Sequence, residues 1–256
     1  MSVLSIESAG LLLAAGLLAG AMNAVAGGGT FVALPALSLM GLPPTLANAS
    51  SSVALFPGIL TSVWSYRRDI HPFGPVSTSS LLWCSLLGGL AGAVLLLLTP
   101  ERAFSAVIPW LLLLATITLA AGPRLSGAIR KLGIHAGPRF LLIAQVILGV
   151  YGGYFGGAVG LMMLAAWSLT STADLRTLNP IRTLMLAAAN GMAVVCFVLT
   201  GNVRWPETLL VMIGAVAGGY LGAQLGRRLP LVLLRGTILT IAVVTTALYF
   251  AQAYFR

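Results

Sequence analysis

The chain has 256 residues, of which 59% are hydrophobic and only 7% are charged, and its mean hydropathy is +1.01. These values exclude an ordinary soluble globular protein and predict an integral membrane protein. The net charge of +9 does not indicate nucleic-acid binding, because the basic residues are scattered over short loops without interleaved aromatic residues. Orientation in a lipid bilayer explains them better.

Apolar runs long enough to cross a hydrocarbon core of about 30 Å recur along the whole chain. The polar connection between the fourth and the fifth run, residues 122–139, is expected to be a cytoplasmic linker. No soluble domain fits between the runs, so we expect a single transmembrane domain over residues 1–256. In chain order, the runs cover residues 9–41, 45–65, 75–99, 103–121, 140–172, 183–199, 206–224 and 231–252.

Three adjacent glycines and a proline interrupt the first run, in AMNAVAGGGTFVALP (21–35). Glycine tolerates the backbone angles of a tight reversal, and Pro35 suits a short, irregular return arm. A cleaved signal peptide is disfavoured, because the residues before this run contain no Lys or Arg and include Glu7. The glycine pattern also returns in mid-chain, in ILGVYGGYFGGAVGL (147–161), and both runs are therefore expected to turn back on themselves.

Internal similarity divides the chain into two halves. LLAGAMNAVAGGGTF (17–31) aligns with residues 147–161, and GGLAGA (88–93) aligns with GGYLGA (218–223). We expect repeat one over 9–121 and repeat two over 140–252. Other glycines recur every fourth residue and are expected to let helices pack closely; they are Gly16, Gly20, Gly88, Gly92, Gly214, Gly218, Gly222 and Gly226.

The basic residues indicate that the two repeats are inverted. If all eight runs crossed the membrane, Lys and Arg would be split almost evenly between its sides, against the positive-inside rule. If 9–41 and 140–172 are hairpins, only Arg102, Arg204 and Arg256 of the 14 basic residues lie outside. The expected fold is an all-α polytopic membrane protein of two inverted repeats, each a glycine-broken helical hairpin plus three transmembrane helices. Both chain termini are then outside.

An inverted repeat with broken helices places a substrate site near the bilayer midplane. Each return arm begins just after its glycines, where a helix N-terminus and successive backbone N–H groups favour an anion. The residues expected to contact the substrate here are Gly27, Gly28, Gly29 and Thr30 in the first repeat and Gly156, Gly157 and Ala158 in the second.

Polar residues at the starts of the following helices are the next candidates. Hydroxyl and amide groups can bind an oxyanion without adding charge, although Ser and Thr also bond to their own helix. A cation inside an apolar helix is expensive unless it is paired or solvated, and a guanidinium group suits sulfite, sulfonate or carboxylate; the alternative is an arginine that snorkels to the interface. The expected contributors are Asn48, Ser51, Ser52, Asn179, Arg182 and Thr183.

Catalytic and metal chemistry is not expected. All acidic residues fall at or beyond the ends of the runs, so neither a buried proton relay nor an acidic Na⁺ site is indicated. His71 and His135 lie in loops and form no metal cluster. Cys84 and Cys196 lie within apolar runs without a ligand spacing. We expect no cofactor and no enzyme, with an intramembrane thiol oxidoreductase that uses the two cysteines as an alternative.

Two motifs resemble the sulfite exporter TauE/SafE family. They are GAMNAVAGGGTFVALPAL (20–37), followed by LANASSS (46–52), and GVYGGYFGGAVGL (149–161). The second repeat departs from the first, since Ala158 replaces the last glycine and Leu164 stands where Pro35 stands in the first. The resemblance implies a permease for sulfite, sulfonates and related anions.

The resemblance and the topology together predict a permease of the cytoplasmic (inner) membrane. A small sulfur-containing or organic oxyanion would be exported by alternating access. An interior-negative potential favours the exit of one negative charge by about 2.3 kcal/mol per 100 mV. The expected partners are this anion and the lipid bilayer, with no nucleic acid. An anion channel of the same architecture is the other open alternative.

Overall fold

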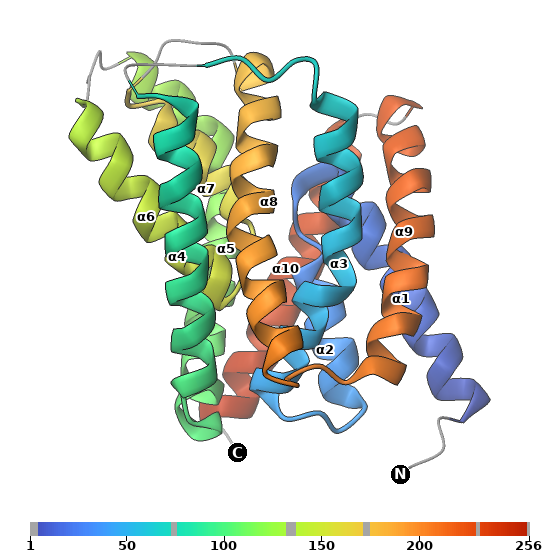
Figure 1. Cartoon of the computed structure of the whole chain (residues 1–256). Coiled ribbons are helices and arrows are strands. Elements are labelled where there is room, and N and C mark those ends of the chain that lie inside the picture. Colours follow the sequence, from blue (N-terminus) through green and yellow to red (C-terminus); the bar gives the residue numbers. More distant parts are fainter. Residues whose placement is uncertain (1–4, 73–75, 132–136, 171–174, 229–230, 255–256) are drawn as a thin grey trace.

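The computed structural model describes residues 5–72, 76–131, 137–170, 175–228 and 231–254. Over these residues all regular secondary structure is helical, and the longer helices run roughly along one direction, side by side (Figure 1). The N- and C-termini lie at the same end of this bundle. The expected all-α architecture is confirmed.

Five helices belong to the first half of the chain. Two of them begin at serine N-caps, because the hydroxyl oxygens of Ser5 and Ser77 accept hydrogen bonds from the backbone N–H groups of Ser8 and Ser80. The helices are α1 (Ile6–Ala26), α2 (Thr30–Leu39), α3 (Pro44–Tyr66), α4 (Thr78–Leu98) and α5 (Glu101–Lys131).

Five more helices follow in the second half, and the first of them has Pro138 in its first turn, where no intrahelical N–H bond is lost. The segment expected as a linker, 122–139, is helical over its first part, since α5 continues to Lys131, whereas 132–136 lie outside the described residues. The helices are α6 (Pro138–Tyr154), α7 (Val159–Trp167), α8 (Leu175–Leu199), α9 (Trp205–Arg228) and α10 (Leu231–Tyr254).

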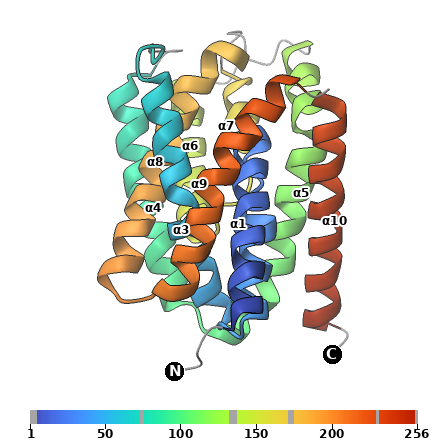
Figure 2. The same ribbon diagram turned by 90° about the vertical axis from the view of Figure 1, so that its right-hand side faces the viewer.

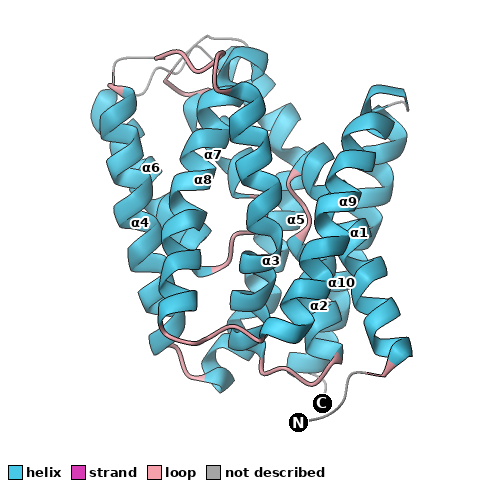
Figure 3. Ribbon diagram, turned by 45° about the vertical axis from the view of Figure 1, so that its right-hand side comes forward, coloured by secondary structure: helices cyan, strands magenta, loops and turns pink. Residues whose placement is uncertain are grey.

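Both predicted breaks at the glycines are confirmed. Helix α1 ends at Gly27, whose φ of 74° is the left-handed conformation that glycine adopts at no steric cost. Helix α6 ends before Gly156, whose φ is 79°, and Ala158 also has a positive φ, of 57°. After each break the chain packs back along the helix that it came from, as α1 against α2 and α6 against α7. Figure 3 shows these two short loop segments in the interior of the bundle, between its ends.

Over the described residues, six helices are long and apolar enough to cross a membrane: α1, α3, α4, α5, α8 and α10. This set contains α1, because its 21 residues extend for about 31 Å at about 1.5 Å per residue. The sequence analysis expected α1 to be one arm of a hairpin. It lacks α9, whose polar first turn with Glu207 and whose glycines lower its hydropathy. Large apolar side chains on the outer surface, such as Trp83, Leu98 and Ile213, suit contact with lipid.

Glycines let two pairs of helices approach until their backbones touch. Between α1 and α9, a Cβ atom placed on Gly20 would overlap the backbone of Ala215, and one on Gly218 would overlap that of Leu17. Between α4 and α6, a Cβ atom on Gly92 would overlap the backbone of Val150. Figure 2 shows α1 beside α9 along most of their length. The expected packing role is confirmed for these glycines, whereas the surroundings of Gly226 lie outside the described part of the chain.

The helix contacts of the two halves correspond to each other. Helix α1 packs on α9 as α6 packs on α4, and α3 packs on α9 as α8 packs on α4. Helices α3 and α8 meet in the middle of the bundle, and α5 meets α10. The core between them is apolar, with Phe31, Phe104 and Phe155 fully buried in one cluster and Met163 and Trp167 in another.

Candidate functional site

The first break lies in largely apolar surroundings. Gly28 and Gly29 are buried, and Gly29 lies against the backbone of Ala19 and the side chain of Leu55, because a Cβ atom on it would be 2.7 Å from the Ala19 carbonyl oxygen and 3.1 Å from Leu55 Cδ1. Thr30, the first residue of α2, is 7% exposed. Among the described residues, no hydrogen bond from the backbone N–H groups of Gly28, Gly29 and Thr30 is found, as is usual for the first residues of a helix.

The second break is held by the last carbonyls of α6. The N–H groups of Phe155 and Gly156 both donate to the carbonyl of Tyr151, at 2.9 and 3.3 Å. Ala158 then precedes the first turn of α7 in the left-handed conformation, which costs a residue with a Cβ atom about 1–2 kcal/mol. Over the described residues, the N–H groups of Gly157 and Ala158 have no hydrogen-bond acceptor. The turn thus forms in the second repeat although Ala158 stands where the first repeat has Gly29.

Polar side chains of α3 and α8 gather at the second break. Asn48 is fully buried and its Nδ2 donates to the carbonyl oxygen of Tyr154, at 2.9 Å. Ser52 lies one turn further along α3, with its Oγ 3.9 Å from the position that a Cβ atom of Gly156 would occupy. The Oδ1 atom of Asn190 is 3.3 Å from the same position. Asn190 is thus a site residue that the sequence analysis missed.

Arg182 lies against the first turn of the return arm α7. A Cβ atom placed on Gly160 would be 3.3 Å from Arg182 Nη1 and 3.5 Å from Cζ, so the guanidinium group packs on the backbone there. Its Nε is buried and has no hydrogen-bond partner among the described residues. No salt bridge to Arg182 is found in that part of the chain either. A cation with an unused donor therefore stands beside a helix N-terminus, where the backbone also favours negative charge.

The predicted hydroxyl ligands bond to their own helices. Ser51 and Ser52 donate to the carbonyl of Asn48 at 2.9 and 3.0 Å, and Thr183 donates to the carbonyl of Asn179 at 2.8 Å. Their oxygen lone pairs remain available as acceptors, but their protons are used. Asn179 itself points to Tyr66, with Nδ2 3.5 Å from the tyrosine hydroxyl. The three hydroxyl bonds therefore lie within α3 and within α8.

The two breaks approach each other along α3. Leu55 contacts Gly29 of the first break, and Ser52 faces Gly156 of the second. Residues three apart on an α-helix lie on the same face, one turn from each other. The structure therefore brings Asn48 and Ser52 to the second break, with Arg182 further along against Gly160 of the return arm, and puts Gly29 one turn away on the more apolar side.

A buried polar cluster fixes the second hairpin. Gln145 of α6 is fully buried, and its Nε2 donates to Ser85 Oγ of α4 at 2.8 Å. Its Oε1 accepts a 3.0 Å bond from Trp167 Nε1 at the end of α7. Because both ends of the amide are used, the cluster holds the two arms of the hairpin and α4 in one arrangement.

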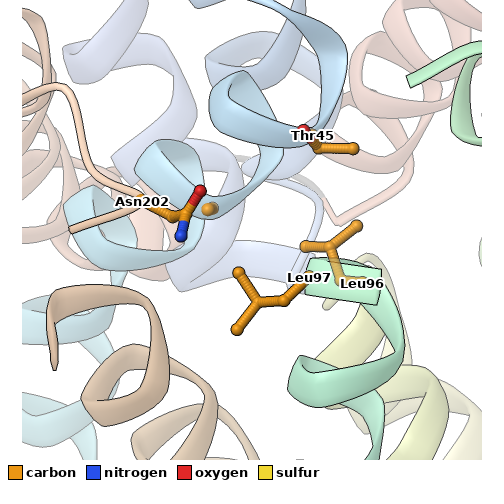
Figure 4. Close-up of a pocket in the computed structure, with 5 residues that line it drawn as sticks. Thr45, Leu96, Leu97 and Asn202 are labelled. Atoms are coloured by element: carbon orange, nitrogen blue, oxygen red, sulfur yellow. The ribbon is translucent and has the colours of Figure 1, made fainter. Parts of the chain in front are cut away.

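A small pocket lies elsewhere in the bundle, at the level of the first turns of α3. Its walls come from Thr45, Ala49, Leu96, Leu97 and Asn202 (Figure 4). Its volume is about 30 Å³, which is room for little more than water. None of the residues of the two breaks lines it, so it is not the candidate anion site.

The described residues offer no other reactive centre. Within them, no group of three or more His, Cys, Asp or Glu side chains could hold a metal ion. Cys84 of α4 and Cys196 of α8 are free. The acidic side chain of Glu207 is buried at the start of α9, where it pairs with Arg204 at 3.3 Å.

The sequence is similar to known membrane transporter proteins. The sequence model of a family described as sulfite exporter TauE/SafE matches residues 12–249. The probable membrane transporter protein YfcA of Escherichia coli K12 is 26% identical over 223 residues, which are 87% of this chain and 80% of that protein. A probable membrane transporter protein of Haemophilus influenzae is 25% identical over 255 residues, 99% of both chains. The probable membrane transporter protein ORF9 of a Sinorhizobium species is 27% identical over 238 residues, 89% of this chain and 85% of that protein.

Proposed function

Because the chain belongs to the sulfite exporter TauE/SafE family, it is a multi-pass membrane transporter, and we propose that its cargo is a small oxyanion such as sulfite or a sulfonate. The anion would be held between Arg182 and the free N–H groups at the second break. The N–H groups of Gly28, Gly29 and Thr30 would receive the anion from the other side.

The observation that carries this proposal is the state of Arg182. Among the described residues its buried Nε has no hydrogen-bond partner, and its guanidinium group packs on Gly160 at the start of α7. Arg182 is partly buried, and a cation that is partly withdrawn from water without a counter-charge is stabilised by an anionic ligand. Sulfite and sulfonates offer the oxygen atoms that a guanidinium fork and backbone N–H groups bind together.

We infer that transport proceeds by alternating access of two inverted repeats, 9–121 and 140–252. Two features support this inference. The helix contacts of one half have counterparts in the other, and both termini lie at one end of the bundle, as an odd number of crossings in each half requires. The two breaks would then enter from opposite faces and form a site that opens to one side at a time.

The proposed direction is export across the cytoplasmic membrane, with both termini outside. The interior-negative potential would assist the exit of each negative charge by about 2.3 kcal/mol per 100 mV. The positive-inside rule supports the orientation, because it places all basic residues except Arg102, Arg204 and Arg256 on the cytoplasmic side.

A reporter that is active only outside the cytoplasm tests this orientation. Fused after Arg256, it should be active, and an inactive fusion would show that the orientation is reversed.

Flux in proteoliposomes tests the cargo. Purified protein is reconstituted, and the efflux of sulfite, a short alkyl sulfonate, thiosulfate and sulfate is measured with an imposed potential of each sign. We expect saturable efflux of sulfite or the sulfonate, accelerated when the anion-containing side is negative. Efflux that does not saturate and shows no counterflow would identify a channel, and no flux of any of the four anions would reject the proposal.

Two arginine variants separate the site from general effects of charge. Arg182→Ala should lower the apparent affinity for the anion by roughly 10- to 100-fold, while the protein still inserts and purifies. Arg67 is the matched control, since its exposed guanidinium group lies over the ring of Trp64, 4.2 Å from the ring centroid, at the end of α3. Arg67→Ala should leave efflux within about twofold of the native rate, because surface substitutions away from special features have small effects.

A further inference from the structure

Oxygen atoms of three helices converge on one point at the second break. The point is the position beside Gly156 that a side-chain Cβ atom would occupy, and it is empty because the residue is glycine. Apart from Gly156 and its two chain neighbours, the three nearest heavy atoms are Asn190 Oδ1 of α8 at 3.3 Å, the Gly152 carbonyl oxygen of α6 at 3.5 Å and Ser52 Oγ of α3 at 3.9 Å. All three are hydrogen-bond acceptors.

In the described part of the chain, no hydrogen bond to any of these three oxygens is found. The N–H of Gly156 would normally bond to the Gly152 carbonyl, but it donates to Tyr151 instead, and among the described residues no backbone N–H reaches Gly152. The amide nitrogen of Asn190 donates to the Leu186 carbonyl at 3.0 Å, so the oxygen of the amide is the end that faces the break. Asn190 is 5% exposed and therefore almost entirely buried.

Asn48 adds a further unpaired oxygen at the same break. Its Nδ2 donates to the carbonyl of Tyr154, two residues before Gly156, and its Oδ1 is bonded to the same carbon as that nitrogen. The residue is fully buried, and Oδ1 has no hydrogen-bond partner within the described part of the chain. A buried acceptor without a donor is costly, so a ligand that satisfies it gains that free energy.

We propose that this cluster, formed by Asn48, Ser52, Gly152 and Asn190, binds a single alkali-metal cation, Na⁺ or K⁺. The atoms are neutral oxygens, which suit a hard monovalent cation. They surround the C-terminal end of α6, where the helix dipole places partial negative charge. Broken helices of inverted-repeat transporters offer ligands of this kind, namely the carbonyls of the unwound segment.

The cation site adjoins the proposed anion site. The oxygen cluster lies beside Gly156, and Arg182 packs against Gly160. These two glycines are only four residues apart in the chain. A cation at the cluster would attract an anion held at Arg182, and the affinity of each ion would rise in the presence of the other by the same factor. Cation binding itself does not depend on the proposed function, and only this coupling rests on it.

The first test is cation binding without any oxyanion. The melting temperature of the native protein in detergent is measured in choline chloride, NaCl and KCl at equal ionic strength, and binding is titrated by calorimetry. A saturable rise in NaCl or in KCl relative to choline supports the site, and the salt with the higher affinity identifies the ion. Equal melting temperatures in all three salts, with no heat of binding, would overturn it.

Variants of Asn190 show whether the binding is at this place. Asn190→Leu removes the oxygen at similar size and should weaken cation affinity by roughly tenfold or more, the scale that even an outer-shell loss costs a metal site. Asn190→Asp adds a negative charge and should strengthen it. If Asn190 only stabilised the fold, the leucine and aspartate variants would not change the cation affinity in opposite directions. Gln252→Glu makes the same kind of change at an exposed position of α10 and should leave the affinity unchanged. Should Asn190→Leu fail to fold, Ser52→Ala removes a different ligand, and unaltered affinity in that variant would count against the site.

The two proposals fail in different ways. Sulfite binding is titrated in choline chloride and in the salt of the cation that binds, and we expect tighter sulfite binding in the latter. If sulfite binds equally in both salts, the coupling is wrong and the proposed function stands. If the cation binds but no oxyanion does, the proposed function is wrong and the cation site stands.

Discussion

The side-chain amide of Asn48, in the first half of the chain, donates a 2.9 Å hydrogen bond to the carbonyl of Tyr154, the last residue of α6 in the second half. This carbonyl is one of those that a helix end leaves without an intrahelical donor. The bond therefore ties the broken end of α6 to α3, and it does so in a fully buried position. The geometry of the second break depends on a residue 106 positions earlier in the chain.

Asn48→Ala should lower stability more than an ordinary polar substitution. The variant leaves the Tyr154 carbonyl buried and unpaired, which costs about 1–3 kcal/mol. Asn202→Ala is the control, because among the described residues the Asn202 side-chain amide bonds to Thr200 of its own loop and to no other residue, and its cost should stay within about 0.5 kcal/mol. The free energies of unfolding are compared by denaturation in mixed micelles. Equal values for the two variants would contradict the role of the bond.

Arg182→Lys should transport more slowly than the native protein but faster than Arg182→Ala. Lysine keeps the positive charge and loses the planar fork that binds two oxygens at once. Loss of hydrogen bonds to a charged ligand costs about 1.5–3 kcal/mol, or roughly 10- to 100-fold in affinity, which sets the scale for the alanine variant. Initial efflux rates over a range of anion concentrations give the apparent affinity of each variant. A lysine variant no better than alanine would show that geometry outweighs charge here, and an undiminished alanine variant would remove Arg182 from the site.

The breaks could be predicted from sequence because glycine is the residue that adopts a positive φ without steric cost. Adjacent glycines at 27–29 and 156–157 do not make one face of a helix, and the structure has a positive φ at Gly27 and at Gly156. The four-residue spacing of Gly16 and Gly20 likewise predicted close helix contact, and their Cβ positions are filled by α9. Such signals are local, so a single sequence contains them.

The side chains that surround the breaks could not be predicted from the sequence in the same way. Asn190 was missed because it lies in the middle of an apolar run, where one amide barely changes hydropathy, and only the packing of α8 on α6 brings it to Gly156. Ser51 and Thr183 were expected to face the substrate, yet their protons go to their own helices. Which side of a helix faces a break depends on tertiary packing, and a helix of polar and small residues gives no single apolar stripe that would fix its rotation.

Gly218→Ala should destabilise the protein, whereas Gly10→Ala should not. A Cβ atom on Gly218 would overlap the backbone of Leu17 in the contact between α1 and α9, and backbone can yield only if the helices separate. Overpacking of this kind costs about 1–3 kcal/mol. Gly10 lies in α1 with no atom within 4 Å of its Cβ position, so alanine there should gain about 0.5–1 kcal/mol from helix propensity. Melting temperatures in detergent should move in opposite directions, and a Gly218→Ala variant as stable as Gly10→Ala would show that α1 and α9 are not in close contact.

Ala158→Gly should stabilise the second break. Ala158 has a φ of 57°, and this left-handed conformation costs about 1–2 kcal/mol for a residue with a Cβ atom but little for glycine. Glycine also loses about 0.5–1 kcal/mol through its more flexible unfolded chain, so we expect a net gain of up to about 1.5 kcal/mol. Ala91 is the control, since it is exposed in the middle of α4, and Ala91→Gly should cost about 1 kcal/mol. Opposite shifts of the melting temperature for the same chemical change would show that Ala158 is held in a strained conformation. Equal losses in both variants would mean that Ala158 has an ordinary helical backbone and that the return arm begins elsewhere.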